Sequence, residues 1–331
     1  MKRVFGRNAG CFLCRSKAAL VIAALAAFVR LSRVKFLAGG LAGGGLGTAI
    51  AAYEHGGHVA WGAYALAQST ITAFHLGTHY GNDYFDRYAD RLTRPTPYSG
   101  GSGALVDGSL PAGVALVAAL VCLGAGLAGT LALALSGAFA AAATGAAIAV
   151  LAWAYSAPPM RLLARGLGEV DTALVVAVLV PLCAYAAQSG MPDRLAIAST
   201  LPGAFAMFAM MLAVEYPDLA ADAAAGKRNL VVRFGAQGAK PIAFVCLGGV
   251  YALGGTVLAA GGPPGYAIAL AGTLPLATGL AAHLRARAAA ADPACDEDLA
   301  ARGVALFFVV TFYGLLAYGA GASVVGVVRR G

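Results

Sequence analysis

Long apolar stretches recur throughout the sequence, and their length decides which class of fold the chain can adopt. Of the 331 residues, 60% are hydrophobic and only 11% are charged, whereas about a quarter of the residues in a soluble domain are charged. An apolar run of about 20 residues is long enough to cross a bilayer as a helix. The sequence therefore predicts an all-α, polytopic membrane protein with about nine transmembrane helices around a central cavity. The expected spans are 34–53, 59–80, 112–134, 137–156, 170–189, 196–214, 240–260, 265–283 and 303–327.

Residues 1–29 precede the first expected span and are interpreted as a cytoplasmic or interfacial extension. The apolar run at 17–29 within this extension is too short to cross a bilayer as a helix. The extension also carries a Cys11-x-x-Cys14 pair. Because no second pair of Cys or His accompanies it, a metal or redox role is disfavoured. The rest of the chain, 30–331, is expected to form one transmembrane domain.

All but three of the 23 Lys and Arg residues fall on one side of the bilayer when the spans are placed alternately. Only Arg194, Arg329 and Arg330 lie on the other side. Because cytoplasmic segments of membrane proteins are rich in Lys and Arg, this asymmetry predicts a cytoplasmic N-terminus, cytoplasmic polar loops and an external C-terminus. It also accounts for the net charge of +8 without a nucleic acid partner. The protein is expected in the cell membrane.

Acidic residues are scarce, yet three of the 15 fall within eight positions after the second expected span. Asp83, Asp86 and Asp90 are spaced by three and four, and Asn82 lies four before Asp86. Side chains with this spacing share a helix face, so the four are expected to face one cavity. Carboxylates gathered near a membrane are costly unless they share a cation.

A second acidic cluster follows the sixth expected span, where Asp218 and Asp222 are four apart and Lys227 and Arg228 come shortly after. A purely structural network of ion pairs is one interpretation. The other is that the two clusters face each other and hold Mg²⁺, which prefers oxygen ligands and is often completed by substrate phosphates. Basic residues nearby would bind the same phosphates, so the sequence predicts a site for a lipid diphosphate. The expected metal ligands are Asn82, Asp83, Asp86, Asp90, Asp218 and Asp222.

These two clusters resemble the motifs of a known family. The pattern N-D-x-x-D-x-x-x-D at 82–90 is similar to the first motif of the UbiA-type intramembrane prenyltransferases. The pattern D-x-x-x-D-x-x-x-G-K at 218–227 is similar to their second motif. The resemblance runs from about Arg30 to the C-terminus. It implies Mg²⁺-dependent transfer of a polyprenyl group from its diphosphate to an aromatic acceptor.

Three further stretches, 94–111, 155–169 and 226–235, look most like the branch that prenylates 1,4-dihydroxy-2-naphthoate in menaquinone synthesis. The sequence departs from that branch in its compact first motif and in having Asn229 where Thr is usual. It also has Arg-Val-Lys at 33–35 in place of a common Arg-Pro. The same chemistry on 4-hydroxybenzoate, homogentisate or a lipid or sugar alcohol is therefore an alternative.

The resemblance also implies roles for individual residues. The expected catalytic residues are Asp86, Asp222, Lys227 and Tyr155. The expected substrate-binding residues are Arg94, Arg161, Lys227, Arg228, Tyr84 and Tyr155. Tyrosine rings would stabilise an allylic cation in a water-poor cavity. Tyr155 as an interfacial anchor and Arg161 as an orienting charge are the competing interpretations.

A secondary transporter is the alternative from another class of protein, since transporters also place carboxylates in the membrane. Its acids are expected near mid-membrane, whereas here they lie at span ends beside Arg and Lys. Among other polar residues, Asp107 and Glu169 are expected to cap or pair, and 296–298 to form a solvated surface. His75 and His79 share one helix face, where hydrogen bonding or cavity lining is favoured over a metal pair.

Overall fold

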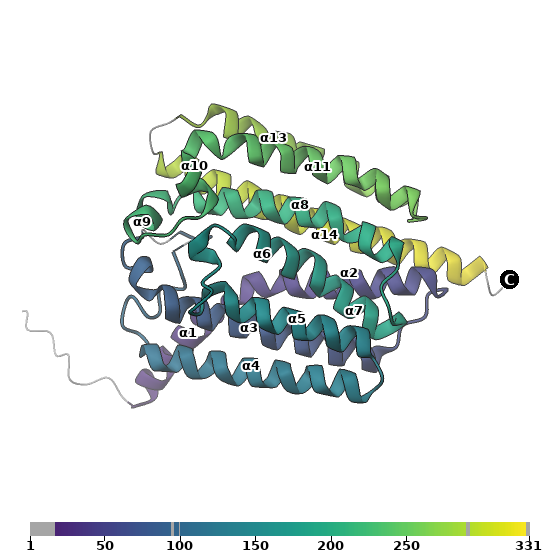
Figure 1. Ribbon diagram of the computed structural model, residues 1–331, viewed down its shortest axis with the longest axis horizontal. Helices are drawn as coiled ribbons and strands as arrows, with labels where there is room; N and C mark the ends of the chain where they lie inside the picture. Colours follow the sequence, from purple (N-terminus) through teal and green to yellow (C-terminus); the bar gives the residue numbers. More distant parts are fainter. Residues whose placement is uncertain (1–16, 94–95, 99, 289–291, 329–331) are drawn as a thin grey trace, which may run out of the picture.

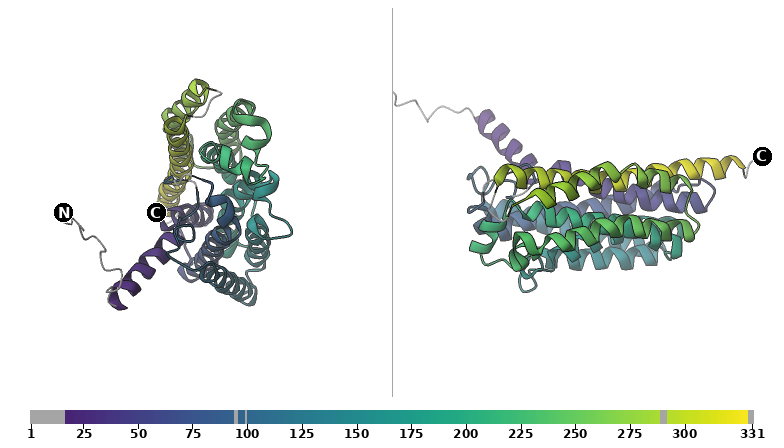
Figure 2. Two further views of the ribbon diagram at one scale, coloured as in Figure 1. Left: turned by 90° about the vertical axis from the view of Figure 1, so that its left-hand side faces the viewer. Right: turned by 90° about the horizontal axis from the view of Figure 1, so that it is seen from above.

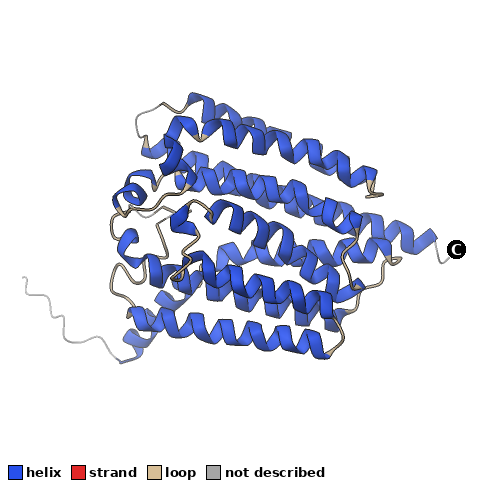
Figure 3. Cartoon of the chain, in the orientation of Figure 1, coloured by secondary structure: helices blue, strands red, loops and turns tan. Residues whose placement is uncertain are grey.

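Helices account for all regular structure in the part of the chain that the computed structural model describes, residues 17–93, 96–98, 100–288 and 292–328 (Figure 3). Their order along the chain is α1 (Lys17–Leu31), α2 (Val34–Glu54), α3 (Trp61–Asp90), α4 (Ala112–Leu135), α5 (Phe139–Ser156), η1 (Leu163–Arg165), α6 (Gly168–Leu174), η2 (Val175–Leu179), α7 (Val180–Ser189), α8 (Arg194–Glu215), α9 (Leu219–Ala224), α10 (Leu230–Gly238), α11 (Lys240–Ala259), α12 (Gly265–Ala271), α13 (Leu274–Ala286) and α14 (Pro293–Val328). The predicted all-α fold is confirmed.

The long helices lie side by side in one bundle, with the short helices α9 and α10 at one end and the C-terminus at the other (Figure 1). Eight helical segments within the described residues are long and apolar enough to cross a membrane. The second expected span, 59–80, is the one not among these eight; it corresponds to α3, which is 30 residues long but carries Gln68, His75 and His79. This helix packs against α2, α4, α5 and α7, so its polar residues lie within the bundle.

Several expected boundaries differ from the observed ones. Helix α3 continues past residue 80 to Asp90, so the first acidic motif lies on this helix, in agreement with its helical spacing. The expected span 170–189 is a chain of three segments, α6, the π-helix η2 and α7, and the expected span 265–283 breaks between α12 and α13. Helix breaks of this kind are tolerated in membranes where neighbouring helices satisfy the backbone.

The apolar run near the N-terminus forms a helix of its own, α1, which projects from the bundle (Figure 2). Ala27 and Leu31, near its C-terminal end, are buried in a small cluster with Tyr80 of α3. Leu20, Ile22 and Leu25 are exposed. Only the end of α1 is thus anchored, in keeping with the expectation that this run is not a span. Cys11 and Cys14 lie outside the described residues.

Small residues allow close approach of the helices at the centre. Gly47 of α2 packs so tightly against α7 that a Cβ atom on it would lie 1.9 Å from the carbonyl oxygen of Pro181. Helices in membranes associate through such small-residue contacts because lipid offers no hydrophobic driving force between them. The largest core cluster joins α2, α8, α11 and α14.

One expectation for the segment between the last two expected spans is wrong, since this segment includes the start of α14. Asp296, expected on a solvated surface, is buried and forms an ion pair with Arg287 after α13. Its neighbour Asp298 is partly exposed and pairs with His283 and Arg302. A buried carboxylate is stable when such a partner compensates its charge, and periodicity in the sequence does not reveal the partner.

Candidate active site

Two acidic motifs that are far apart in the sequence meet at one end of the bundle. Asp86 lies near the end of α3, and Asp222 lies in α9, the short helix after α8. The Lys227 ammonium lies between them, with Nζ 3.1 Å from Asp86 Oδ2 and 3.0 Å from Asp222 Oδ1. One cation therefore joins the two motifs.

The chain after α3 folds back over the first motif. Asp83 pairs with Arg33 of the α1–α2 junction and accepts hydrogen bonds from the Ser102 hydroxyl and, at 3.2 Å, from the Ser102 backbone N–H. Gly101 has a φ of 71°, and a Cβ atom on it would lie 2.4 Å from Asp90 Oδ2. Glycine suits both the backbone angle and the close approach, so this segment covers the Asp83–Asp90 side of the cluster.

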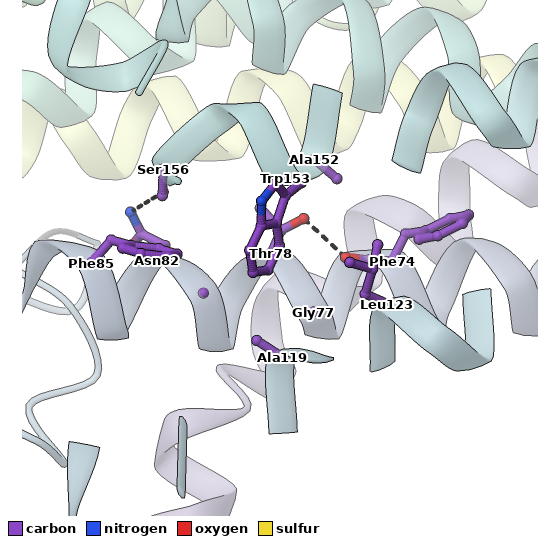
Figure 4. Close-up of a pocket in the computed structure, with 11 residues that line it drawn as sticks. Phe74, Gly77, Thr78, Asn82, Phe85, Ala119, Leu123, Ala152, Trp153 and Ser156 are labelled. Atoms are coloured by element: carbon purple, nitrogen blue, oxygen red, sulfur yellow. Dashed lines mark hydrogen bonds between the residues drawn. The ribbon is translucent and has the colours of Figure 1, made fainter. Parts of the chain in front are cut away.

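Asn82 connects the acidic cluster to α5. Its Nδ2 donates to Asp86 Oδ2 at 3.1 Å and to the Ser156 hydroxyl at 3.2 Å, while its Oδ1 accepts from Arg33 Nη2 at 3.2 Å. Figure 4 shows Asn82 and Ser156 near Trp153, where they line a small pocket between α3, α4 and α5. Asn82 thus positions Asp86 in this conformation.

The second motif is held by the segment that follows it. Asn229 Nδ2 donates to Asp222 Oδ2 at 2.8 Å, and Asn229 Oδ1 accepts from the Val232 backbone N–H at 2.8 Å, which caps α10. The backbone N–H of Leu230, the residue after Asn229, donates to Glu169 Oε1 at 2.5 Å. Asn229, one of the departures from the naphthoate branch, therefore fixes both a helix start and a carboxylate.

The charges around Lys227 reinforce one another. Burial by itself would lower the pKa of the Lys227 ammonium, but the carboxylates of Asp86 and Asp222 outweigh burial and raise that pKa above its usual value. Burial raises the pKa of the Asp222 carboxyl, and Lys227 and Asn229 oppose this effect. Lys227 is therefore a positive charge held in place at neutral pH.

A cavity of about 230 Å³ opens beside this cluster and extends between the helices. Its polar end includes Arg33, Asn82 and Tyr155. Apolar side chains such as Phe74 and Phe307 line the rest. A pocket with one charged end and an apolar body suits an amphipathic ligand.

The structure does not bring every expected residue to this cavity. Tyr84 packs with the cluster around α1, and its ring lies 4.5 Å from the Arg87 guanidinium carbon. The physical reason is helical geometry, because side chains two residues apart, as Tyr84 and Asn82 are, do not share a face. Arg161 and Arg228 are exposed. Like Asp86, Asp222 and Lys227, they are not among the residues that line the cavity.

Three other residues singled out in the sequence have different outcomes. Asp218 is partly buried at the start of α9 and precedes Asp222 by one helical turn. Arg94 lies outside the described residues. Asp107 pairs with Arg30 at 2.9 Å, as the pairing interpretation predicted.

Sequence reasoning missed Arg33 as a site residue. It lines the cavity and contacts Asp83 and Asn82, although it lies about 50 positions away from them along the chain. It was counted only as an orienting charge before the first span. Its left-handed backbone, with a φ of 45°, is a feature that local sequence does not signal.

The expected metal ligands, one Asn and five Asp residues, would all bind a metal through oxygen atoms. Within the described residues, no three His, Cys, Asp or Glu side chains are arranged as one metal centre. The space between Asp86 and Asp222 is instead a cation site already, filled by the Lys227 ammonium. Carboxylate and amide oxygens are ligands for hard divalent cations. The donor chemistry therefore fits Mg²⁺.

The helical bundle, the apolar spans and the charged end of the cavity place the protein in the class of multi-pass membrane enzymes. A family model of the UbiA prenyltransferase family matches residues 45–299. The chain belongs to this family, and the protein is a prenyltransferase. Among curated proteins, none matches the sequence.

Solved structures share the fold. Digeranylgeranylglyceryl phosphate synthase superposes with a TM-score of 0.63 at 17% identity, over 91% of this chain and 99% of that one. An apo UbiA homolog from Aeropyrum pernix K1 superposes with a TM-score of 0.62 at 16% identity, over 86% of this chain and 97% of that one. A UbiA homolog from Archaeoglobus fulgidus bound to GPP and Mg²⁺ superposes with a TM-score of 0.61 at 18% identity, over 90% of this chain and 99% of that one. At these identities the likeness establishes the fold.

Proposed function

We propose that the protein transfers a prenyl group from a prenyl diphosphate to an aromatic acceptor in the membrane and that the reaction requires Mg²⁺. The observation that carries the proposal is the Lys227 bridge between Asp86 and Asp222, because it joins both acidic motifs and because Asn82, which donates to Asp86, lines the charged end of an apolar cavity. The Archaeoglobus fulgidus homolog has been solved with GPP and Mg²⁺ and with DMAPP and Mg²⁺, which supports the same ligand class here.

The residues proposed to hold the metal lie on both motifs. They are Asn82, Asp83, Asp86, Asp90, Asp218 and Asp222. Mg²⁺, when bound, would neutralise the charge that develops on the departing diphosphate. Arg33 and Lys227 compensate part of the carboxylate charge in the conformation described here.

Basic residues are proposed to bind the diphosphate. Lys227 already lies at the centre of the cluster, and its ammonium can donate to phosphate oxygens as well as to carboxylates. Arg228 and Arg161 are exposed near the same end and are proposed to contribute long flexible cations. Arg94 is assigned the same role from the sequence alone.

The cavity beyond the charged end is proposed to hold the prenyl chain and the acceptor. Tyr155 lines it on α5 and presents an aromatic ring near the reacting end. An aromatic face stabilises an allylic cation, and apolar walls keep water from capturing it. Phe74 and Phe307 contribute such walls.

The proposed acceptor is 1,4-dihydroxy-2-naphthoate, and the proposed pathway is menaquinone biosynthesis. The support is the resemblance of residues 94–111, 155–169 and 226–235 to that branch. Asn229 holds Asp222 in this structure, so its departure from Thr is compatible with a working second motif. 4-Hydroxybenzoate, homogentisate and a lipid alcohol remain the alternative acceptors.

The orientation is also a proposal. The N-terminus and the loops that carry the site are proposed to be cytoplasmic and the C-terminus external, on the basis of the Lys and Arg asymmetry. The site and the C-terminus lie at opposite ends of the bundle (Figure 1), in agreement with this orientation. Labelling of a single Cys introduced near the C-terminus, in intact cells with an impermeant reagent, tests it.

The decisive test of function uses purified protein, a labelled prenyl diphosphate, Mg²⁺ and the panel of acceptors, with the product identified by its mass. Prenylated product is expected with Mg²⁺ and none with EDTA. Product from an acceptor other than the naphthoate would refute only the acceptor assignment. Absence of product from every acceptor, together with ion-coupled uptake of a solute into vesicles, would favour the transporter alternative.

A further inference from the structure

Two histidines on α3 face the cavity and take no part in the metal or diphosphate roles proposed above. His75 and His79 both line the cavity, and their ring centroids are 4.6 Å apart in an edge-on arrangement. The Phe36 ring from α2 and the His79 ring are in a T-shaped arrangement, with the centroids 6.5 Å apart. His79 is therefore a polar group packed against two neighbouring rings in the cavity wall.

The hydrogen bond of His79 defines which of its nitrogens carries the proton. His79 Nδ1 lies 3.0 Å from the backbone carbonyl oxygen of Ser32. A carbonyl oxygen only accepts, so Nδ1 donates, and in the neutral ring Nε2 then carries a lone pair. This second nitrogen is a hydrogen-bond acceptor in the wall of an apolar cavity, where a matching donor is strongly preferred.

A positive charge lines the same cavity as this acceptor. Arg33 follows Ser32 directly in the chain and is among the lining residues. Its Nη2 binds Asn82 and Asp83, while its buried Nε has no hydrogen-bond partner among the described residues. The cavity wall thus contains both a neutral acceptor and a guanidinium.

We propose that His79 recognises the aromatic acceptor by accepting a hydrogen bond at Nε2 from a ring hydroxyl, with Arg33 in the same cavity wall for a carboxylate on the neighbouring ring carbon. The inference rests on the proposed function, and it narrows the substrate class to ortho-hydroxy aromatic acids. In such acids the hydroxyl and the carboxylate are on neighbouring ring carbons, so one edge of the ring presents both groups to the cavity wall that contains His79 and Arg33. In a para-hydroxy acid the two groups lie at opposite ends of the ring, so no single edge presents both.

The test measures binding without turnover, using 1-hydroxy-2-naphthoate and 2-naphthoate as probes and calorimetry on the full-length protein in detergent. The two probes share a carboxylate and differ only in the hydroxyl. The wild type is expected to bind 1-hydroxy-2-naphthoate about tenfold more tightly, the effect of one well-placed hydrogen bond. A wild type that binds the two probes equally would overturn the proposal.

Two variants of His79 separate recognition from structure. His79→Asn keeps a side-chain N–H for the Ser32 carbonyl but removes the Nε2 acceptor, and His79→Phe keeps the ring packing against Phe36 but removes both nitrogens. In each, the preference for the hydroxyl is expected to fall below about twofold. If either folded variant, judged by its thermal transition, keeps the tenfold preference, His79 is not the recognition residue.

The matched control is His58→Asn, since His58 is an exposed histidine between α2 and α3 at the far end from the site. It is expected to keep the full preference. Loss of the preference in His58→Asn as well would overturn the assignment to His79. A wild type that shows the preference yet prenylates no acceptor would support the recognition site and refute the proposed function, so the two failures are distinguishable.

Discussion

Two clusters of buried charge lie at the same end of the bundle, and they differ in how completely their charges are paired. Around Arg287 the pairing is one to one. Its guanidinium binds both oxygens of Asp296, one of them at 2.9 Å, and donates to the Ala288 carbonyl oxygen at 2.9 Å. The Tyr216 ring lies 4.8 Å from the guanidinium carbon. We call this Arg287–Asp296 pair the closed pair, because each of its two charges is matched by the other. It joins the end of α13 to the start of α14.

Around Lys227 the pairing is incomplete. One ammonium serves both Asp86 and Asp222, and Asn82, which donates to Asp86, lines the cavity. Carboxylate oxygens have more lone pairs than these contacts use. A buried pair with matched partners stabilises a fold only modestly, whereas carboxylates that share one cation retain capacity for another. Incomplete pairing, rather than burial, therefore distinguishes the proposed functional cluster from the Arg287–Asp296 pair.

The largest loss of activity is expected from changes to the two carboxylates that share Lys227. Asp86→Asn and Asp222→Asn are expected to reduce prenyl transfer by about 10³-fold each, since each removes a charge that the proposed metal and the developing diphosphate charge depend on. Turnover of labelled prenyl diphosphate by the membrane-inserted variants measures this loss. Near-normal turnover in both would refute the metal assignment.

The closed pair is expected to affect stability and not chemistry. Arg287→Met leaves the Asp296 carboxylate buried without its partner, at a cost of about 3 kcal/mol in the free energy of unfolding. The thermal transition in detergent reports the loss, and kcat per folded molecule should stay unchanged. The double variant Arg287→Met with Asp296→Leu is expected to recover stability. A large fall in kcat would show that this pair also serves the reaction.

The shared ammonium is expected to matter for binding the diphosphate. Lys227→Met should raise the KM for prenyl diphosphate by about 30-fold, the value of a charge-assisted hydrogen bond. Steady-state kinetics at saturating acceptor give this number. Arg233→Met, in α10 and outside the cavity lining, is the control and should leave KM unchanged. A KM that does not change in Lys227→Met would reduce the Lys227 bridge to a structural role.

The smallest expected effect distinguishes the two tyrosines. Tyr155→Leu removes an aromatic ring from the cavity wall and is expected to lower kcat by about fivefold, within the range of a cation–π contact. Tyr84→Leu, on the α1 side of α3, should change kcat by less than about twofold. Product formation at saturating substrates measures both. Equal losses would show that Tyr84 acts on the site despite its position.

Helical periodicity was sufficient to predict part of this site. Residues three and four apart on α3 and α9 do present their carboxylates to a common region, and the sequence located Asp86, Asp222 and Lys227 there. The prediction that included Tyr84 ignored the same rule, because a position two residues from Asn82 faces elsewhere. Helical spacing predicted which side chains lie together where a single helix carries the whole motif.

Contacts between distant segments were beyond this reasoning. Arg33 reaches Asp83 only because the α1–α2 junction adopts a left-handed turn and α3 runs back beside it. Asp296 is buried only because Arg287 lies at the end of the preceding helix. Neither partner has a periodic signature, so the sequence showed the charges without their pairing.

The polarity of α3 has a consequence for how the protein enters the membrane during synthesis. A helix with Gln68, His75 and His79 within its expected span is poorly recognised for insertion on its own, because each polar side chain opposes transfer into lipid. Helix α4, the next in the chain, is the most apolar of the eight candidate spans and packs along α3. We expect the two helices to enter the bilayer together as a hairpin, so that the proposed site residues on α3 depend on α4 to reach the membrane.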